Sequence, residues 1–477
     1  MARVESIRSS QRLVEYEPLP GCHDEAFEAR GRLRPAYAGV LACIDAGPPA
    51  RIAAAIEESL ASRGVNFRFE GTDAAFPIDA VPRVLSATEH SLIERGLTQR
   101  AAALDSFIAD AYAEQRIVAS GELPERVVSG SPLYEPLMRG VEVPGGTFAH
   151  VCGPDLVRDA EGDFLVLEDN LRSPSGLSYA LEARRALAPQ LPLAHFEPLP
   201  IEGAIETLSA ALLAAAPEAV DEPRVVLLSD GPDSGAWFEH RSLAARLEIS
   251  LVRPSDLRVT EGRVWSHSAT GRAPVDVIYR RTTEERLSEP DGRLTGLGQL
   301  LAEPIQAGTV AIANAFGTGV GDDKLAHAYV ERMIRFYLGE EPLLRSVPTQ
   351  DLGDPRERAE VLERLDEMVV KRRGGLGGGE VHILHGAGRE ERKHVEEMIR
   401  SDPDQYVAQD RIELSTHPTV SGDGLEPRRV DLRAFAIRTG RGYEVTRAAL
   451  SRYAPKADSM FVNSSLGGGG KDTWVVA

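Results

Sequence analysis

The sequence HVCGPDLVRDAEGDFLVLEDN occupies residues 150–170. It contains two apolar runs separated by the turn-forming residues 159–162, a pattern typical of a β-hairpin. Successive side chains of a strand point to opposite faces, so Glu168 and Asn170 share one face and Asp169 lies on the other. The hairpin therefore sorts its acidic residues into two different environments.

The spacing of oxygen-bearing side chains in this hairpin indicates a metal site. If the turn is centred on residues 160–161, Asp155 lies opposite Val166 and diagonal to Glu168, on the face that carries Asn170. Mg²⁺ prefers such hard oxygen ligands, and it completes its coordination with water and nucleotide phosphates. An acidic hairpin that faces solvent is the alternative that this spacing alone leaves open.

A lysine followed by glycines, VVKRRGGLGGG at residues 369–379, indicates a phosphate site. Lys371 ends an apolar run that reads as a buried strand, and the glycines expose backbone N–H groups that close over a phosphate. A flexible linker is the alternative, but linkers rarely follow a strand that ends in three cations. A P-loop is excluded because GGGGKD (467–472) has no Ser or Thr after Lys471, and no GxGxxG fingerprint is present at 317–321 or 374–379.

Three arginines are weaker candidates. Arg280 and Arg281 follow the apolar run VDVIY, where a strand's carboxyl end could place them around a substrate carboxylate. A solvated strand end is the alternative for at least one of them. Arg172 follows Asn170 by two residues and could face phosphate or pair with the acidic residues of the hairpin.

Composition limits the classes of function. With 54 basic and 73 acidic residues the net charge is −19, which disfavours binding to nucleic acid or anionic membranes. Three widely spaced cysteines without a CxxC pair, and histidines without ligand spacing, argue against disulfides and zinc. The N-terminus lacks the features of a signal peptide and no apolar run reaches membrane-spanning length, so a cytoplasmic protein is expected.

The chain divides into three regions on its apolar patterns. Residues 1–200 are predicted to hold N-terminal helices and the hairpin, and the proline-rich stretch 192–203 reads as a linker. Residues 201–310 alternate strands and helices and are predicted to form a small α/β unit with some parallel pairing. Residues 311–477 contain the glycine loop, and residues 322–339 read as one helix.

Four motifs in order resemble a known family. The strings LEDNLRSPSGLSYALEAR (167–184), NAFGTGVGDDK (314–324), VVKRRGGLGGG (369–379) and VNSSLGGGGKDTW (462–474) are similar to the circularly permuted type 2 ATP-grasp proteins, relatives of glutathionylspermidine synthetase. The likeness runs from FPIDAVPR (76–83) to the C-terminal motif. It implies an α/β (α+β) ATP-grasp fold with an added substrate-binding unit, and ATP and Mg²⁺ as cofactors.

The resemblance also implies residue roles. It assigns Mg²⁺ binding to Asp155, Glu168 and Asn170, and nucleotide binding to Lys324, Lys371, the adenine-hinge residue Gln409 and the lid glycines Gly374, Gly375, Gly377 and Gly378. One departure is Gly153, where the relatives carry an arginine. We expect Arg172, or else Arg433, to supply the missing cation at the transferred phosphate.

The function implied is ligation of a small-molecule or peptide carboxylate to an amine through an acyl phosphate. Arginines near the site favour an anionic substrate. Glu168→Ala is expected to abolish Mg²⁺-dependent ATP turnover, and Asp169→Ala to be milder. Two alternatives stay open: a phosphotransferase on the same fold, and a nucleotide-binding protein without ligase chemistry. The oligomeric state is also open.

Overall fold

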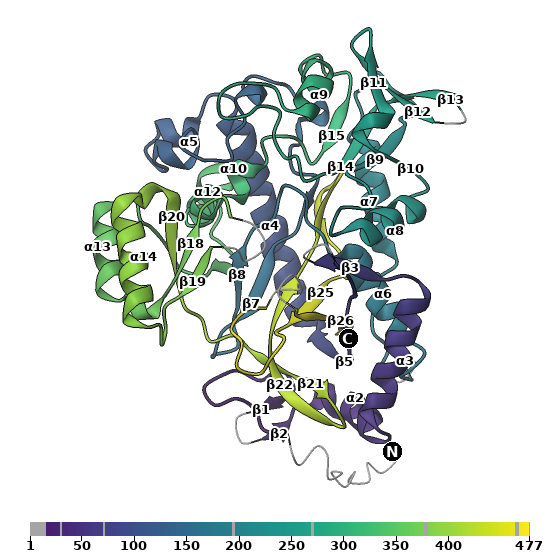
Figure 1. The fold of residues 1–477 in the computed structure, drawn as a ribbon, viewed down its shortest axis with the longest axis vertical. Coiled ribbons are helices and arrows are strands. Elements are labelled where there is room, and N and C mark those ends of the chain that lie inside the picture. Colours follow the sequence, from purple (N-terminus) through teal and green to yellow (C-terminus); the bar gives the residue numbers. More distant parts are fainter. Residues whose placement is uncertain are drawn as a thin grey trace.

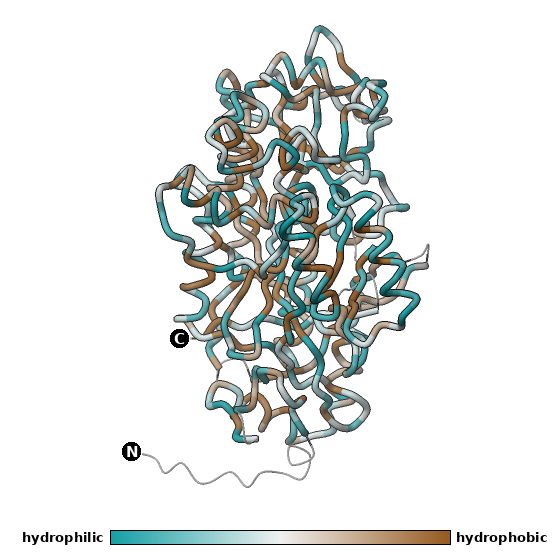
Figure 2. Tube along the Cα trace, turned by 90° about the vertical axis from the view of Figure 1, so that its left-hand side faces the viewer, coloured by the Kyte–Doolittle hydropathy of each residue, from teal (hydrophilic) through white to brown (hydrophobic). Residues whose placement is uncertain are grey.

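A computed structural model describes residues 16–28, 31–69, 72–192, 196–268, 271–375, 380–462 and 467–476 (Figure 1). The fold is mixed α/β, as the sequence predicts. Figure 2 shows apolar and hydrophilic stretches alternating along the helices and strands, which is expected of elements that bury one face.

A mixed central sheet joins the two ends of the chain. Its last strand pairs in parallel with β5, near the N-terminus, while most of the other pairings are antiparallel. In spatial order the strands are β16 (Arg345–Ser346), β8 (Phe164–Glu168), β7 (Asp155–Arg158), β22 (Gly424–Arg433), β25 (Leu450–Tyr453), β26 (Gly469–Val476) and β5 (Ile78–Ser86), with β21 (Thr416–Ser421) also paired to β22.

A smaller antiparallel sheet stands beside β7 and β8 and carries the predicted lysine strand (Figure 1). Its strands, in spatial order, are β17 (Thr349–Asp351), β20 (Tyr406–Asp410), β18 (Met368–Arg372) and β19 (Val381–Ile383). Helices α13 (Pro355–Glu363) and α14 (Arg389–Ser401) belong to the same part of the chain. Asp354 starts α13 by accepting hydrogen bonds from two backbone N–H groups of its first turn.

The region predicted as a small α/β unit contains a parallel sheet and an antiparallel meander. The parallel strands are β10 (Ser250–Val252), β9 (Val225–Ser229), β14 (Val277–Arg281) and β15 (Ala311–Ala313). The meander consists of β11 (Leu257–Thr260), β12 (Arg263–Ser268) and β13 (Gly271–Val275). The helices are α7 (Gly203–Ala214), α8 (Trp237–Arg246) and α9 (Gly296–Gln306).

The remaining elements surround the central sheet. The strand pairs are β1 (Phe27–Glu28) with β2 (Arg32–Leu33) and β3 (Asn66–Phe69) with β4 (Thr72–Ala75), and a further sheet contains β6 (Val151–Cys152), β23 (Ala436–Thr439) and β24 (Gly442–Val445). The helices are α2 (Pro35–Asp45), α3 (Pro49–Ser62), α4 (Ala87–Ala111), α5 (Arg116–Ala119), α6 (Leu177–Leu187), α10 (Gly319–Asp322), α11 (Lys324–His327) and α12 (Val330–Leu338). A Ser86 and Glu89 capping box begins α4.

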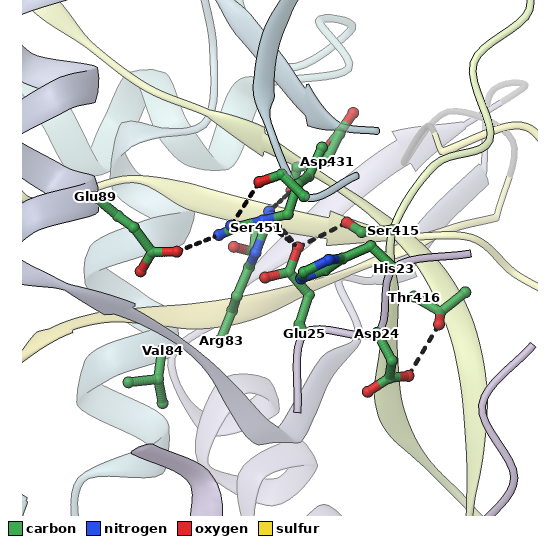
Figure 3. A network of polar contacts seen from close by, with 12 residues as sticks. His23, Asp24, Glu25, Arg83, Val84, Glu89, Ser415, Thr416, Asp431 and Ser451 are labelled. Carbon is green, nitrogen blue, oxygen red and sulfur yellow. Dashed lines mark hydrogen bonds and ion pairs between the residues drawn. The ribbon is translucent and has the colours of Figure 1, made fainter. Parts of the chain in front are cut away.

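A buried ionic network fastens the N-terminal segment to the central sheet (Figure 3). The Glu25 carboxylate accepts hydrogen bonds from Arg83 at 2.6 Å and from the Ser415 hydroxyl at 2.7 Å. Arg158 lies 3.2 Å from the same carboxylate and also binds Glu89. Strands β5 and β7 are thereby tied to a residue near the beginning of the described chain.

One sequence prediction about elements was wrong. Residues 322–339 do not form one helix, because the helix is interrupted at Tyr329, between α11 and α12. The Tyr329 hydroxyl donates to Asp351 at 2.8 Å. The proline-rich stretch predicted as a linker connects α6 to α7, and its described part packs against the C-terminal strand. Phe196 packs against Trp474, and the backbone N–H of Leu199 donates to Val475.

Candidate functional site

A cavity of about 400 Å³ lies between the central sheet and the sheet that carries β18 and β20. Its wall collects residues from segments that are more than 250 positions apart in the chain. The site residues predicted from sequence that line it are Asp155, Glu168, Asn170, Arg172, Lys324, Lys371, Gly375, Gln409 and Arg433. Arg280, Arg281 and Gly374 lie outside this wall, and Gly377 and Gly378 fall outside the described residues.

The two candidate carboxylates face each other across β7 and β8. Asp155 pairs directly with Glu168, while Val166 pairs with Leu156. The predicted pairing of Asp155 with Val166 was therefore wrong, because the turn is centred on Glu161 rather than on residues 160–161, and a bulge between Asp155 and Leu156 shifts the register further. The shift brings the two carboxylates closer than the diagonal arrangement would.

Asp155 lies within a group of charges. The guanidinium of Arg433 binds both of its carboxylate oxygens, and Arg452 lies 2.9 Å from Oδ2. Burial opposes ionisation, but these two arginines hold the pKa of Asp155 well below its usual range. Arg452 also binds Asp431, whose own pKa burial raises to about 6.

The side chain of Asn170 turns its amide nitrogen toward these groups. Its Nδ2 donates to the Gly153 carbonyl at 3.1 Å and approaches Asp155 Oδ2 at 3.4 Å. A cation shared by all three candidate ligands needs the amide oxygen there instead, which a rotation of the terminal amide provides.

Lys371 reaches into the cavity from the end of β18. Its Nζ donates to Gln409 Oε1 at 2.5 Å, and the Gln409 amide nitrogen donates to Thr349 at 3.0 Å and to the Leu167 carbonyl at 3.2 Å. Burial lowers the pKa of Lys371 to about 8; Glu168 acts against this shift and Lys324 adds to it. Gln409 thus fixes the position of a lysine that burial has made less basic.

The other cations around the glycine segment have different roles. Lys324, the first residue of α11, donates through Nζ to the Gly375 carbonyl at 2.6 Å. Arg372 is exposed and pairs with Glu380, whereas Arg373 is buried and forms an ion pair with Asp323. Of the three consecutive cations in the sequence, only Lys371 lines the cavity.

The three predicted arginines differ in their access to the cavity. Arg172 lines it but is held by Asp322 at 3.0 Å and by Glu285 at 2.5 Å. Arg281 is buried, pairs with Glu239 at 2.9 Å and donates to the Pro174 carbonyl. Arg280 is also buried and donates to the Arg172 carbonyl at 3.3 Å.

Gly153 has no room for a side chain. A Cβ atom there would lie 2.4 Å from Pro174 Cβ and 3.3 Å from Arg433 Cδ. The relatives carry an arginine at the position of Gly153. In this chain the side chain of Arg433 lies beside that position.

Most of the chain matches the model of one protein family. The model of the family described as circularly permuted ATP-grasp type 2 matches residues 82–454. The chain belongs to this family.

Proteins similar to this chain occur in several bacteria. A Frankia casuarinae protein named "Putative glutamate--cysteine ligase 2-2" is 42% identical over 97% of this chain and 55% of its own length, so the chain spans about half of that relative. An uncharacterized Mycobacterium tuberculosis protein is 41% identical over 95% of this chain and 84% of its own. An uncharacterized Synechocystis protein is 39% identical over 97% of this chain and 98% of its own length.

A solved structure supports the ATP-grasp fold. The apo form of a glutathione synthetase-like effector (GSS30) from Globodera pallida aligns with a TM-score of 0.57 at 12% identity, covering 90% of this chain and 98% of that one. In the described residues no single helix is long and apolar enough to cross a membrane, although α2 and α3, bent by 87°, pass that test together.

Several residues of the ATP-grasp cavity were not identified from the sequence. Asp431 lies on the same face of β22 as Arg433, and it pairs across the sheet with Arg452. The two-residue spacing in VDLR was the available signal. Thr349 and Asp322 act by holding Gln409 and Arg172, and such long-range partners leave no local pattern. No cluster of three or more His, Cys, Asp or Glu side chains suited to a metal occurs among the described residues.

Proposed function

We propose that this chain is an ATP- and Mg²⁺-dependent ligase that joins a carboxylate to an amine through an acyl phosphate. The observation that carries the proposal is that paired carboxylates, Asp155 and Glu168, share one cavity with Lys324 and Lys371. The name of the Frankia relative supports a carboxylate and an amine as the two substrates. The phosphotransferase and the nucleotide-binding protein without chemistry are outcomes of the test below.

The donor set fits a hard divalent cation. Two carboxylates at directly paired positions repel each other unless a proton or a cation lies between them. Asp155, Glu168 and Asn170 would hold Mg²⁺, which when bound offsets the negative charge of the nucleotide phosphates. The arginines that now neutralise Asp155 must share it with the metal.

The lysines form the other side of the proposed nucleotide site. No described carboxylate forms an ion pair with Lys371, although Glu168 acts on it from a distance, and an anion placed beside the lysine favours its charged form. Lys324 donates to the backbone at Gly375, so it connects the glycine segment to the same cavity. Gln409 keeps Lys371 in place and lies on the strand proposed as the adenine hinge.

Arg433 is the better candidate for the cation that Gly153 lacks. Both arginines bind carboxylates, but Arg433 fills the space next to Gly153 and its partner Asp155 is a proposed metal ligand, whereas Arg172 is held by Asp322 and Glu285. In the proposed reaction the substrate carboxylate attacks the γ-phosphorus and releases ADP. The amine then displaces phosphate from the acyl carbon, forming the C–N bond and releasing a proton.

The proposal is tested with the purified chain, ATP, Mg²⁺, a panel of carboxylates and hydroxylamine as a general amine. A ligase releases ADP and forms the hydroxamate of the carboxylate. A phosphorylated product without a hydroxamate, or with no amide across a panel of amines, identifies a phosphotransferase. Nucleotide binding with no ADP release under any condition identifies a protein without chemistry.

A further inference from the structure

Besides the apolar residues on β18 and β19, such as Val369 and Ile383, a second group of apolar side chains lines the cavity on the side of β3 and α6. These are Phe67 on β3, Phe76 just before β5, Tyr179 on α6 and Leu450 on β25, here called the apolar wall. Figure 1 shows β3 and α6 on one side of β7 and β8, and β18 and β20 on the other. The cavity therefore extends from the lysines, past the paired carboxylates, to the apolar wall.

The rings of the apolar wall are packed into a fixed surface. The ring centroids of Phe76 and Tyr179 are 4.5 Å apart, and Phe67 meets Tyr179 edge-on at 6.4 Å. Phe238 supports Tyr179 from outside the cavity at 5.6 Å. Because Tyr179 and Phe76 are each only 3% exposed, the wall is already formed without a ligand.

The hydroxyl group of Tyr179 is not available to a ligand. It donates to the Asn66 carbonyl at 2.9 Å, and burial raises its pKa above the ordinary value, so it stays neutral. The wall therefore presents ring surface and a leucine rather than a hydrogen-bonding group.

The cations that line the described part of the cavity are either paired with carboxylates or distant from the apolar wall. Every arginine that lines the described part of the cavity has a carboxylate partner: Arg172 with Asp322 and Glu285, Arg411 with Glu413, Arg433 with Asp155, and Arg452 with Asp155 and Asp431. The two lining lysines lie on the far side of β7 and β8, near the glycine segment. Arg433 is the cross-strand partner of Leu450 and so adjoins the wall. Once the reacting carboxylate lies at Arg433, a second carboxylate on the substrate would meet the wall without a cation of its own.

We infer that the carboxylate substrate carries an apolar side chain, which packs against Phe67, Phe76, Tyr179 and Leu450 while its carboxylate lies toward Arg433. Burial of apolar surface favours such a side chain, and desolvation of an unpaired charge disfavours an acidic one such as that of glutamate. This inference rests on the proposed ligase function. It narrows the substrate class to monocarboxylates with aromatic or aliphatic groups.

Binding measurements test the inference directly. We expect calorimetric titration, with Mg²⁺ and a non-hydrolysable ATP analogue present, to show 3-phenylpropionate binding at least about tenfold more tightly than glutarate. Phe67→Ala removes part of the wall from a half-buried position. It should weaken 3-phenylpropionate about tenfold or more and leave the affinity for the nucleotide analogue unchanged.

Phe336→Ala is the matched control, because Phe336 is also half-buried but lies on α12, outside the cavity. The inference is overturned if glutarate binds as tightly as 3-phenylpropionate, if neither binds, or if Phe67→Ala behaves like Phe336→Ala. The ligase proposal fails separately, when 3-phenylpropionate binds but no carboxylate yields ADP and a hydroxamate. If glutarate yields a hydroxamate and 3-phenylpropionate does not, only the wall inference falls.

Discussion

Glu168 and Asp169 are adjacent residues with opposite environments. Glu168 lines the cavity and faces Asp155, while Asp169 points away and is buried. Asp169 accepts two hydrogen bonds from Arg100, both at 2.7 Å, and lies 3.0 Å from His327 Nδ1. The strand alternation read from the sequence is confirmed, and it separates a carboxylate that lines the cavity from one that is paired with Arg100.

Glu168→Ala is predicted to abolish Mg²⁺-dependent ATP turnover while the protein stays folded. Removal of a direct ligand should exceed the roughly 10- to 100-fold loss that follows when an outer partner of a metal ligand is removed. ADP release measured against Mg²⁺ concentration, together with the melting temperature, gives the result. Glu161→Ala, at an exposed position in the turn of the same hairpin, is the control and should keep full turnover. Wild-type turnover in Glu168→Ala would remove Glu168 from the metal site.

Asp169→Ala is predicted to lower the stability of the protein more than Glu168→Ala does. The sequence predicted a milder effect on ATP turnover than that of Glu168→Ala. For stability, the structure shows that the substitution leaves the guanidinium of Arg100 buried without its carboxylate. Breaking a buried ion pair in this way costs about 3–5 kcal/mol. Urea unfolding measures it, and Asp163→Ala, which removes an exposed pair with Arg345, should change stability by no more than about 0.5 kcal/mol. Equal effects of the two substitutions would contradict the structural role.

At the scale of single elements, the glycine segment after β18 is anchored by one arginine. Arg373 forms an ion pair with Asp323, the N-cap residue of α11, and also donates to the carbonyls of Asp404 and Arg126. Arg373→Lys loses the planar fork that makes these bonds together, and it should destabilise the protein by about 1–3 kcal/mol. The melting temperature of this variant is compared with that of Arg372→Lys, at an exposed site. Equal melting temperatures of the two variants would contradict the anchoring role of Arg373.

Helix α4 carries a pH-dependent contact. Burial raises the pKa of Asp105 to about 6, although its carboxylate accepts the backbone N–H groups of Phe148 and Ala149. Since the unfolded carboxyl titrates near 4, the unfolded chain holds fewer protons between pH 4 and 6, and stability should fall as pH rises through this window. The loss is about 1–3 kcal/mol for this half-buried group. Asp105→Asn keeps an acceptor oxygen and should flatten the pH dependence measured by urea unfolding; an unchanged slope would exclude Asp105 as its source.

The elements that the sequence predicts well are those whose signals are local. The hairpin of β7 and β8 follows from two apolar runs and a turn, and β9, α8 and β14 follow from the alternation of patterns. The bulge beside Asp155 and the interruption at Tyr329 have no local sequence signal, and both residues contact partners far away in the sequence, Arg433 and Asp351. Lys371, Arg372 and Arg373 are likewise adjacent cations in the sequence. In the structure Arg372 pairs with Glu380 and Arg373 with Asp323, so only Lys371 of these three lines the cavity.

For the molecule as a whole, the order of the chain differs from its arrangement in space. Regions 1–200 and 311–477 were predicted separately, yet both contribute strands to one sheet, with β26 between β25 and β5. The parallel sheet of the middle region extends to β15, just past the predicted limit at 310. The motifs at both ends of the chain were recognisable, but their pairing depends on contacts nearly 400 residues apart in sequence.

A buried ion pair adds to the backbone pairing between β5 and β26. Lys471 on β26 donates to Asp79 on β5 at 2.5 Å and to the Pro418 carbonyl at 3.1 Å, and its side chain is fully buried. Asp79 also accepts the backbone N–H groups of Val81 and Val420. These two N–H groups bind different carboxylate oxygens. An asparagine at position 79 therefore keeps an acceptor for only one of them, besides removing the charge.

Lys471→Met is therefore predicted to destabilise the protein by about 3–5 kcal/mol, because it leaves the Asp79 carboxylate buried without its cation. The double variant Lys471→Met with Asp79→Asn removes both charges, so it should be more stable than the sum of the two single effects by about 1–3 kcal/mol. Urea unfolding followed by the fluorescence of Trp474, which is buried on β26, reports on this part of the sheet. Lys456→Met, at an exposed position, is the control. Strictly additive effects of the two substitutions would mean that the ion pair does not couple β5 to β26, and that backbone pairing alone holds the ends together.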